Sequence, residues 1–310
     1  MHHIAMGAVH HSLLERGRQA TLAEWVDRNE AQAAALYMES EDIGAVCLFS
    51  GFCQAALPHK KLADTDAWQI TSGHITLIVE PGRRPGANST PEHVGVPYGS
   101  RARLILLYLQ SEALRTNSRE IRLGRSMRDW LGRMNVPIGG KPMNMVRDQA
   151  ERISRCRLSF NTKIGKRVDI IQQSIVDGAM FLEGQDGQGS LFLEVAKLSE
   201  GFYAQLQRHS VPLEEAAIRA INNNSMALDL YAWLAYRLHS LPGQTPVSWS
   251  ALKAQFGAAF GTTFHFKPTF LSNLRLALAV YPDAKVEVTD RGVTMIPSRP
   301  PVAPRLLGYR

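Results

Sequence analysis

The sequence has 310 residues, of which 45% are hydrophobic, with a formal net charge of +7 and a pI of about 9.4. This length and apolar content exclude a disordered or fibrous chain and favour two or three globular domains. The longest strongly apolar run, Leu104–Leu109, is far shorter than the roughly 18 to 20 residues that cross a bilayer, and residues 1–18 hold no apolar signal core. We therefore expect a cytoplasmic protein without a membrane partner.

Three cysteines, Cys47, Cys53 and Cys156, occur at irregular spacing. This odd number argues against a disulfide framework and for a reducing compartment, with the thiols serving as small buried apolar groups. Cys47, Cys53 and His59 lack the C-x-x-C spacing with which two thiolates hold one zinc ion from a single turn. We therefore expect neither a metal nor a cofactor.

The first region, residues 1–96, has the pattern of an α+β extension. Its apolar residues recur at helical spacing over Val9–Met38, and strand-like runs follow at Ala45–Phe49 and Trp68–Glu80. Gly73 divides the second run into two alternating segments, which predicts a β-hairpin. No residue of this acidic region points to a particular chemistry, so partner contacts, dimerisation and regulation all stay open for it.

The segment Pro81–Pro91 predicts a domain linker. It contains three prolines and two glycines, and these residues interrupt both helices and strands. We therefore place the first domain boundary at residue 96.

Residues 97–210 are predicted to form a first winged helix-turn-helix domain. Ser126 is a suitable N-cap, because its hydroxyl can accept a hydrogen bond from an unpaired amide of the first helical turn. The expected elements are a helix at Arg101–Arg115, a strand at Glu120–Leu123, a helix at Ser126–Met134, a turn at Asn135–Gly140, a helix at Pro142–Arg157, and a hairpin of strands Arg157–Lys163 and Val168–Phe181. This order is typical of a winged helix-turn-helix.

Residues 211–298 repeat the order and are predicted to form a second such domain, before a tail at 299–310. The expected elements are a helix at Ser225–Leu241, a strand at Pro246–Trp249, a helix at Ser250–Phe256, a turn through Gly261, a helix at Pro268–Val280 and a hairpin at Lys285–Ile296. Five pairs align at one offset of 126 positions: Leu104 with Leu230, Ile121 with Val247, Trp130 with Phe256, Lys141 with Lys267 and Pro142 with Pro268. A shared offset indicates tandem copies, although apolar positions at helical spacing can also align by chance.

The positive charge is concentrated in one block. Residues 101–170 contain sixteen lysines and arginines against six acidic residues, whereas the rest of the chain is nearly balanced. Such a block attracts polyanions, and DNA is the most common partner because each neutralised phosphate releases condensed counterions. A solvated face of ion pairs is the alternative, but six acids cannot pair with sixteen bases.

The third helix of the first domain has one apolar and one polar face. Val146, Ala150 and Ile153 fall at i, i+4 and i+7 and should face the core. The polar face fits the major groove, where arginine pairs with guanine and asparagine with adenine. We therefore expect Asn144 and Arg147 to contact bases. The expected phosphate ligands are Arg125, Arg128, Arg152 and Arg155, with Lys141 beside them at the turn.

The last helix of the second domain gives a second candidate reading face. Leu271, Leu274 and Leu278 form the predicted buried stripe, and a surface helix that binds nothing is the alternative for the opposite side. That side comprises Lys267, Thr269, Ser272, Asn273 and Arg275, with Lys267 and Arg275 as phosphate ligands. The hairpins would be wings that touch the flanking backbone or minor groove through Lys163, Lys166 and Arg167 in the first and Arg291 in the second.

Three stretches, Val96–Thr116, Gly124–Leu131 and Gln149–Leu158, resemble the plasmid-encoded RepA replication initiators. The similarity is strongest over about 96–181 and continues more loosely through Ser50–Cys53, Leu57–His59 and Ala227–Tyr236. The resemblance implies a protein that recognises repeated sites in double-stranded DNA at a plasmid origin, promotes duplex opening and recruits the host initiator and replicative helicase. It also implies a monomer–dimer equilibrium, in which dimers repress the gene and monomers start replication.

Catalytic alternatives find little support. The sequence has no H-x-H motif for metal-dependent nicking, because His2-His3 and His10-His11 are adjacent pairs. Gly139-Gly-Lys-Pro142 has proline where a phosphate-binding loop needs a hydroxyl. Asp64 and Asp66 lack a third carboxylate in sequence that would indicate a nuclease. We therefore expect no enzymatic activity.

Two other functions stay open. A transcriptional repressor could use the same two helices at an operator without starting replication. An adaptor could bind acidic protein partners through the basic block at 101–167.

Overall fold

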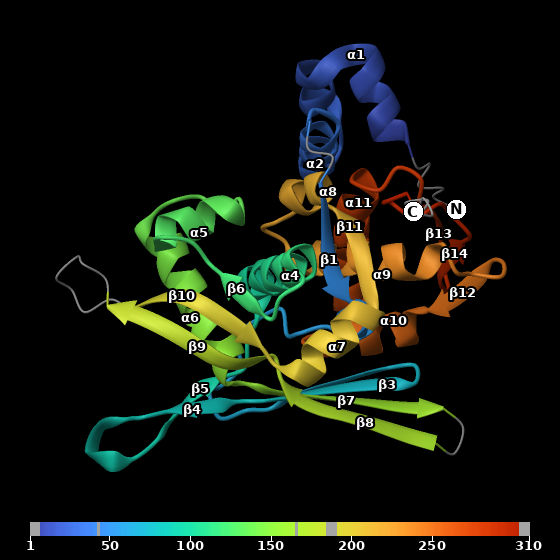
Figure 1. The fold of residues 1–310 in the computed structure, drawn as a ribbon. Coiled ribbons are helices and arrows are strands. Elements are labelled where there is room, and N and C mark those ends of the chain that lie inside the picture. The colour runs from blue at the N-terminus through green and yellow to red at the C-terminus, as the bar shows by residue number, and fades with distance from the viewer. Residues whose placement is uncertain (1–6, 42–43, 165–166, 184–190, 304–310) are drawn as a thin grey trace, which may run out of the picture. The chain divides into compact units, whose positions relative to one another are not determined.

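The computed structural model describes residues 7–41, 44–164, 167–183 and 191–303. The chain divides into two compact units, and Figure 1 shows their elements. Unit 1 comprises Met1–Val46 and Val211–Arg310, and unit 2 comprises Cys47–Ser210. The predicted α+β class is confirmed, because both units combine helices with antiparallel strands. The boundary predicted at residue 210 coincides with a division between the units, whereas the one at residue 96 lies inside unit 2.

The helical pattern at the N-terminus forms two helices, α1 (Ala8–Glu24) and α2 (Arg28–Met38). They are separated at Trp25–Asp27, where the Asp27 carboxylate caps α2 by accepting hydrogen bonds from two backbone amides. Four alanines of α2 are buried. Their small side chains let α2 pack closely on α8 (Glu215–Ala220) and α11 (Thr263–Ala279), so this N-terminal segment belongs to the same unit as the C-terminal part of the chain.

The C-terminal part of unit 1 has the predicted order of elements. After β1 (Ala45–Phe49), which unit 2 shares, and β11 (Ser210–Glu214), the elements are α8, α9 (Ser225–Leu238), β12 (Thr245–Ser248), α10 (Trp249–Phe256), α11, β13 (Lys285–Thr289) and β14 (Gly292–Ile296). The last three strands form one antiparallel sheet in the order β12–β14–β13. The hairpin predicted at Lys285–Ile296 is therefore confirmed.

Aromatic side chains fill the core between helices α9, α10 and α11. Trp233 of α9 packs edge-to-face on Phe256 of α10 with ring centroids 5.4 Å apart, and Trp249 does the same on Phe270 of α11 at 5.8 Å. Phe266 and Phe270 are fully buried. These contacts fix α10 and α11 against α9.

Unit 2 is built around the long buried helix α4 (Gly99–Thr116). Its other elements are α3 (Ser50–Gln54), β2 (Trp68–Ser72), β3 (Ile75–Glu80), β4 (Gly82–Arg84), the 3₁₀ helix η1 (Ala87–Ser89), β5 (Glu92–Gly95), β6 (Glu120–Arg122), α5 (Met127–Arg133), α6 (Gly140–Arg155), β7 (Arg157–Ile164), β8 (Arg167–Ser174), β9 (Val176–Glu183), β10 (Leu191–Leu198) and α7 (Glu200–Arg208). The hairpin predicted at Gly73 is confirmed as β2–β3, with Gly73 at a positive φ of 58°.

The wing predicted for the first domain is wrong in its pairing. The hairpin β7–β8 pairs with β3 and extends a four-stranded sheet, β2–β3–β7–β8. The strand that pairs with β6 is β10, and β9 pairs with β10, giving the order β6–β10–β9. The predicted strand at Val168–Phe181 divides at the buried Ile175, where β8 ends and β9 begins.

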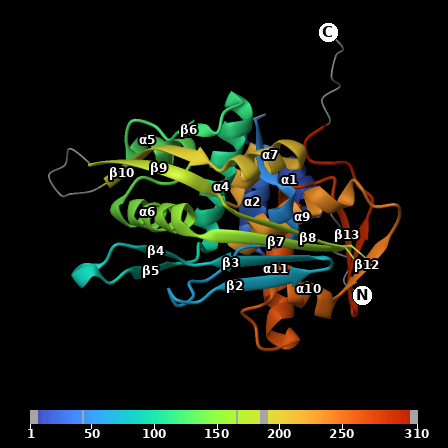
Figure 2. The ribbon, with the colours of Figure 1, turned by 60° about the horizontal axis from the view of Figure 1, so that its bottom comes forward.

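The predicted linker is a hairpin, not a connection between domains. Residues 82–84 and 92–95 pair as β4 and β5, and both strands pack against α6. Figure 2 shows α6 between this hairpin and the β9–β10 hairpin. The three prolines of the segment lie just outside the two strands, at 81, 85 and 91, so no proline removes a hydrogen bond within them.

Candidate nucleic-acid interface

In unit 2, α5 and α6 form a helix-turn-helix whose local structure follows from its sequence. The Ser126 hydroxyl accepts a hydrogen bond from the Asp129 amide at 3.2 Å, as predicted for an N-cap. At the other end of α5, Asn135 has a positive φ of 51°, and the Val136 amide donates back to the Leu131 carbonyl at 2.8 Å. Both Leu131 and Val136 are buried, so the turn is fixed from inside.

Helix α6 exposes only its first turns. Gly139 precedes it, Lys141 and Asn144 are exposed, and Arg147 is half-buried. The predicted core stripe is confirmed, because Val146, Ala150 and Ile153 are all buried. Asn144 and Arg147, the expected base contacts, therefore lie near the accessible N-terminal half of the helix.

Three cations of the helix-turn-helix lie just before α5, in its first turn and in the first turn of α6. Arg125, Arg128 and Lys141 are exposed, and none forms a salt bridge with any described residue. Other arginines of the basic block are neutralised: Arg133 pairs with Asp129 at 3.2 Å, and Arg115 pairs with Glu112 at 2.7 Å. We call Arg125, Arg128 and Lys141 the α5–α6 cations. Of the predicted phosphate ligands of unit 2 whose side chains are described, these three are accessible.

Arg152 is not an accessible phosphate ligand, contrary to the prediction. Its side chain is only 4% exposed and forms salt bridges with Asp64 at 3.0 Å and Asp148 at 2.9 Å. Its guanidinium also donates to the Val96 carbonyl at 3.4 Å and lies 5.3 Å from the centre of the Tyr98 ring. Burial acts against the charged carboxylate of Asp64, but the hydrogen bond and charge of Arg152 hold its pKa below the usual value.

Arg155 is also occupied within the fold. Its Nε lies 3.2 Å from the Glu151 carboxylate, and its Nη1 donates to the Arg83 carbonyl of β4 at 3.0 Å. Arg84 of the same strand reaches Glu151 at 3.3 Å. The β4–β5 hairpin therefore packs on the C-terminal half of α6 and holds Arg155, whose side chain is 32% exposed, so its phosphate contact stays a prediction.

In unit 1, the predicted contacts are divided between surface and interior. Thr269 and Ser272 are exposed on α11, and Arg291 is exposed at the turn between β13 and β14. Lys267 is half-buried, with its ammonium 4.9 Å from the centre of the Trp249 ring.

Asn273 and Arg275 do not belong to an exposed reading face. Asn273 is 8% exposed, and its side-chain amide donates to the Thr269 carbonyl at 2.7 Å. Arg275 is half-buried and lines a hollow with Trp25, where its charge attracts Glu30. Packing of α2 against α11 covers this side of the helix. In the predicted stripe Leu274 and Leu278 are buried, but Leu271 is only half-buried.

The wing contacts of the first domain fall outside the described part. Lys166 is not among the described residues, and neither are the side chains of Lys163 and Arg167.

Sequence reasoning missed the first turn of α11. The helix begins at Thr263, not at Pro268, and the Thr262 hydroxyl caps it by accepting from the His265 amide at 3.4 Å. Phe264, in this turn, is 82% exposed. A threonine directly before an aromatic-rich run is an N-cap signal that could have located the start, but proline is itself common at helix starts.

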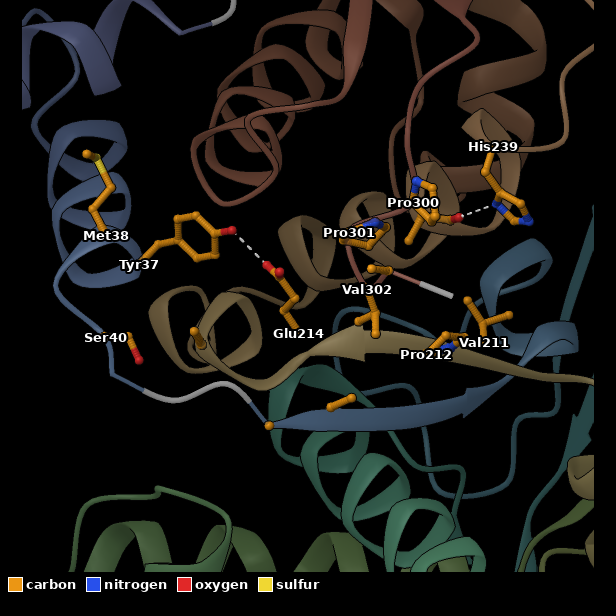
Figure 3. Close-up of a pocket in the computed structure, with 15 residues that line it drawn as sticks. Tyr37, Met38, Ser40, Val211, Pro212, Glu214, His239, Pro300, Pro301 and Val302 are labelled. Carbon is orange, nitrogen blue, oxygen red and sulfur yellow. Dashed lines mark hydrogen bonds between the residues drawn. The ribbon is translucent and has the colours of Figure 1, made fainter. Parts of the chain in front are cut away.

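A cavity of about 880 Å³ lies elsewhere in unit 1 (Figure 3). The Tyr37 hydroxyl donates to the Glu214 carboxylate at 2.7 Å, and the His239 ring nitrogen Nδ1 lies 2.9 Å from the Ala235 carbonyl oxygen. Burial, with the nearby charge of Asp283, raises the pKa of Glu214 despite the hydrogen bond from Tyr37. None of the predicted DNA contacts lines this cavity.

The described residues show neither a metal site nor a membrane span. They contain no group of three or more side chains able to hold a metal ion. Within the same part of the chain, no helix is both long and apolar enough to cross a membrane.

Comparison with known proteins decides the family. Residues 96–249, which include α4, α5 and α6, match the model of a family described as plasmid encoded RepA protein. The region 96–249 belongs to this RepA family. The assignment agrees with the resemblance of the sequence and supports a role in starting plasmid replication. No curated protein matches the chain.

Among solved structures, the chain is similar to domains 2 and 3 of RctB. One crystal structure, of selenomethionine derivatives, has 11% sequence identity and a TM-score of 0.51, and the alignment covers 82% of this chain and 98% of that one. A second, also of RctB domains 2–3, has 12% identity and a TM-score of 0.44, with 79% and 94% covered. At this identity the first likeness shows a shared fold alone.

Proposed function

We propose that this protein is a plasmid replication initiator that binds double-stranded DNA through two winged helix-turn-helix domains and has no chemistry of its own. The observation that carries the proposal is the family match over residues 96–249, which spans the helix-turn-helix of unit 2. The bound sites would be repeated sequences at the origin of the plasmid.

The repeated topology supports two domains of one kind. In unit 2 the order is α4, β6, α5, α6, β9 and β10, and in unit 1 it is α9, β12, α10, α11, β13 and β14. Both three-stranded sheets place the last strand between the other two, β6–β10–β9 and β12–β14–β13. The β7–β8 hairpin is an insertion between α6 and β9 that has no counterpart between α11 and β13.

DNA binding by unit 2 would use the accessible half of α6. The α5–α6 cations would contact phosphates and set the position of the helix, while Asn144 and Arg147 would read base edges in the major groove. Arg291 in unit 1 would contact flanking phosphates. Binding through such contacts weakens steeply as salt concentration rises, because the release of counterions into a more concentrated salt solution gains less free energy.

The later steps are proposed from the family alone. Bound at the origin, the protein would promote duplex opening and recruit the host initiator and replicative helicase, with a monomer–dimer equilibrium that separates initiation from repression of its own gene. The runner-up function is a repressor that uses the same helices without starting replication.

Two experiments test the proposal. DNase footprinting on the DNA adjacent to the gene should show several directly repeated protected sites, whereas a plain repressor should protect an inverted repeat at a promoter. A plasmid that carries only this gene and its adjacent DNA should be maintained in a host that cannot otherwise replicate it. Loss of that plasmid, with intact protein and a single palindromic footprint, would favour the repressor.

A further inference from the structure

The exposed face of α11 is almost uncharged. Its first turn presents Phe264 and His265, and the next turns present Pro268, Thr269 and Ser272, all exposed. The side chains of this helix that could form the bidentate contacts typical of guanine or adenine are held elsewhere: Lys267 on Trp249, Asn273 on the helix backbone, and Arg275 toward α2.

Phe264 is the most exposed aromatic side chain in the described part of the chain, at 82%. The fold does not require it there, because Thr262 caps the helix and the buried Phe266 and Phe270 anchor it. Its one ring contact among the described residues is an edge-on approach to His265, itself exposed, at 5.4 Å between ring centres. Most of the apolar surface of Phe264 therefore faces solvent.

The position of Phe264 matches that of a base-reading residue. Phe264, Pro268 and Ser272 are spaced four residues apart and follow one line along the helix, on the side opposite the buried Phe266, Phe270 and Leu274. In a helix-turn-helix the N-terminal residues of the second helix contact base edges in the major groove. Thymine is the one base that presents a methyl group in the major groove. The phenylalanine ring and the methyl group of threonine both make suitable apolar contacts with that group.

We infer that α11 reads thymine, and that Phe264 contacts the C5-methyl group of a thymine in the DNA half-site bound by unit 1. This inference rests on the proposed function and adds a division of roles to it. The cationic α5–α6 surface supplies salt-dependent affinity, and α11 supplies discrimination by apolar contact.

The test replaces single thymines with uracil in the duplex that the footprint defines. Uracil keeps every hydrogen-bonding group of thymine and removes only the methyl group. At one or two positions the substitution should weaken binding of the wild-type protein about four-fold, the factor expected when burial of one methyl group is lost. Phe264→Ala should weaken binding to thymine DNA by at least that factor and should show no further loss on uracil DNA at the same positions.

Leu14→Ala is the matched control, because Leu14 of α1 in the same unit is 75% exposed and lies outside the reading face. It should bind both duplexes like the wild type. Equal loss on uracil DNA in Phe264→Ala and in the wild type would overturn the thymine contact, as would no uracil effect at any position. Absence of wild-type binding to any footprinted fragment would instead overturn the proposed function, so the two failures are distinguishable.

Discussion

Replacing Arg152 with alanine separates a structural role from a DNA-binding role. The side chain is 4% exposed and bonds to two carboxylates, each about 40% exposed, as well as to a backbone carbonyl. A hydrogen bond to a charged group contributes about 1.5 to 3 kcal/mol to stability. Because Asp64 and Asp148 are partly exposed to solvent, we use the low end of that range for each bond. With the loss of the Tyr98 contact, we expect Arg152→Ala to lower the free energy of unfolding by about 3 to 4 kcal/mol.

For a domain of this size such a loss lowers the melting temperature by on the order of 10 °C. Thermal melting followed by circular dichroism measures it, and Arg128→Ala, which removes an exposed arginine without a salt bridge among the described residues, is the matched control with no expected shift. At a temperature where Arg152→Ala is folded, the slope of log affinity against log salt should equal that of the wild type. A variant with wild-type melting and a slope reduced by about 0.9, the value for one lost phosphate contact, would refute the structural role.

Three further predictions follow from local geometry. Gly95→Ala should destabilise unit 2 in urea unfolding by more than 1 kcal/mol, because Gly95 has a positive φ of 72° and a Cβ there would contact Arg152. Its control is Gly132→Ala in α5, where a Cβ meets open space. This change should stabilise unit 2 by about 0.5 to 1 kcal/mol. Ser126→Ala should cost about 1 kcal/mol through loss of the N-cap, measured in the same way. Burial raises the folded pKa of Glu214 above its unfolded value, so its contribution to stability is lost as pH rises through the folded pKa. Glu214→Gln should therefore raise the melting temperature at pH 8 and have little effect near pH 4. An equal effect at both pH values would contradict the raised pKa of Glu214.

Local patterns in the sequence predicted the elements well. The α5 N-cap, the β2–β3 turn at Gly73 and the order from α9 to β14 depend on residues close together in the chain, and the structure has each of them. Strand pairing does not depend on neighbours in sequence. The wing was therefore assigned to β7–β8, although β6 pairs with β10, far along the chain.

The candidate site was predicted only in part, for a related reason. Helical periodicity separates the core face of α6 from the other side but cannot tell whether that side meets solvent or another element. Arg152 and Arg155 point away from the stripe of Val146, Ala150 and Ile153, yet they meet the segment around the β4–β5 hairpin. The prolines and glycines of this hairpin suggested a linker. The composition does not show that the prolines lie outside the two strands and leave the strands free to pair.

The salt dependence of binding to origin DNA tests the central claim most directly. The full-length protein should bind a footprinted fragment with an affinity that falls steeply with salt. The combined variant Arg125→Ala/Arg128→Ala/Lys141→Ala should melt like the wild type and reduce the slope of log affinity against log salt by up to about 3, since each phosphate contact contributes about 0.9. An unchanged slope in a folded variant would contradict the assignment of this surface to DNA.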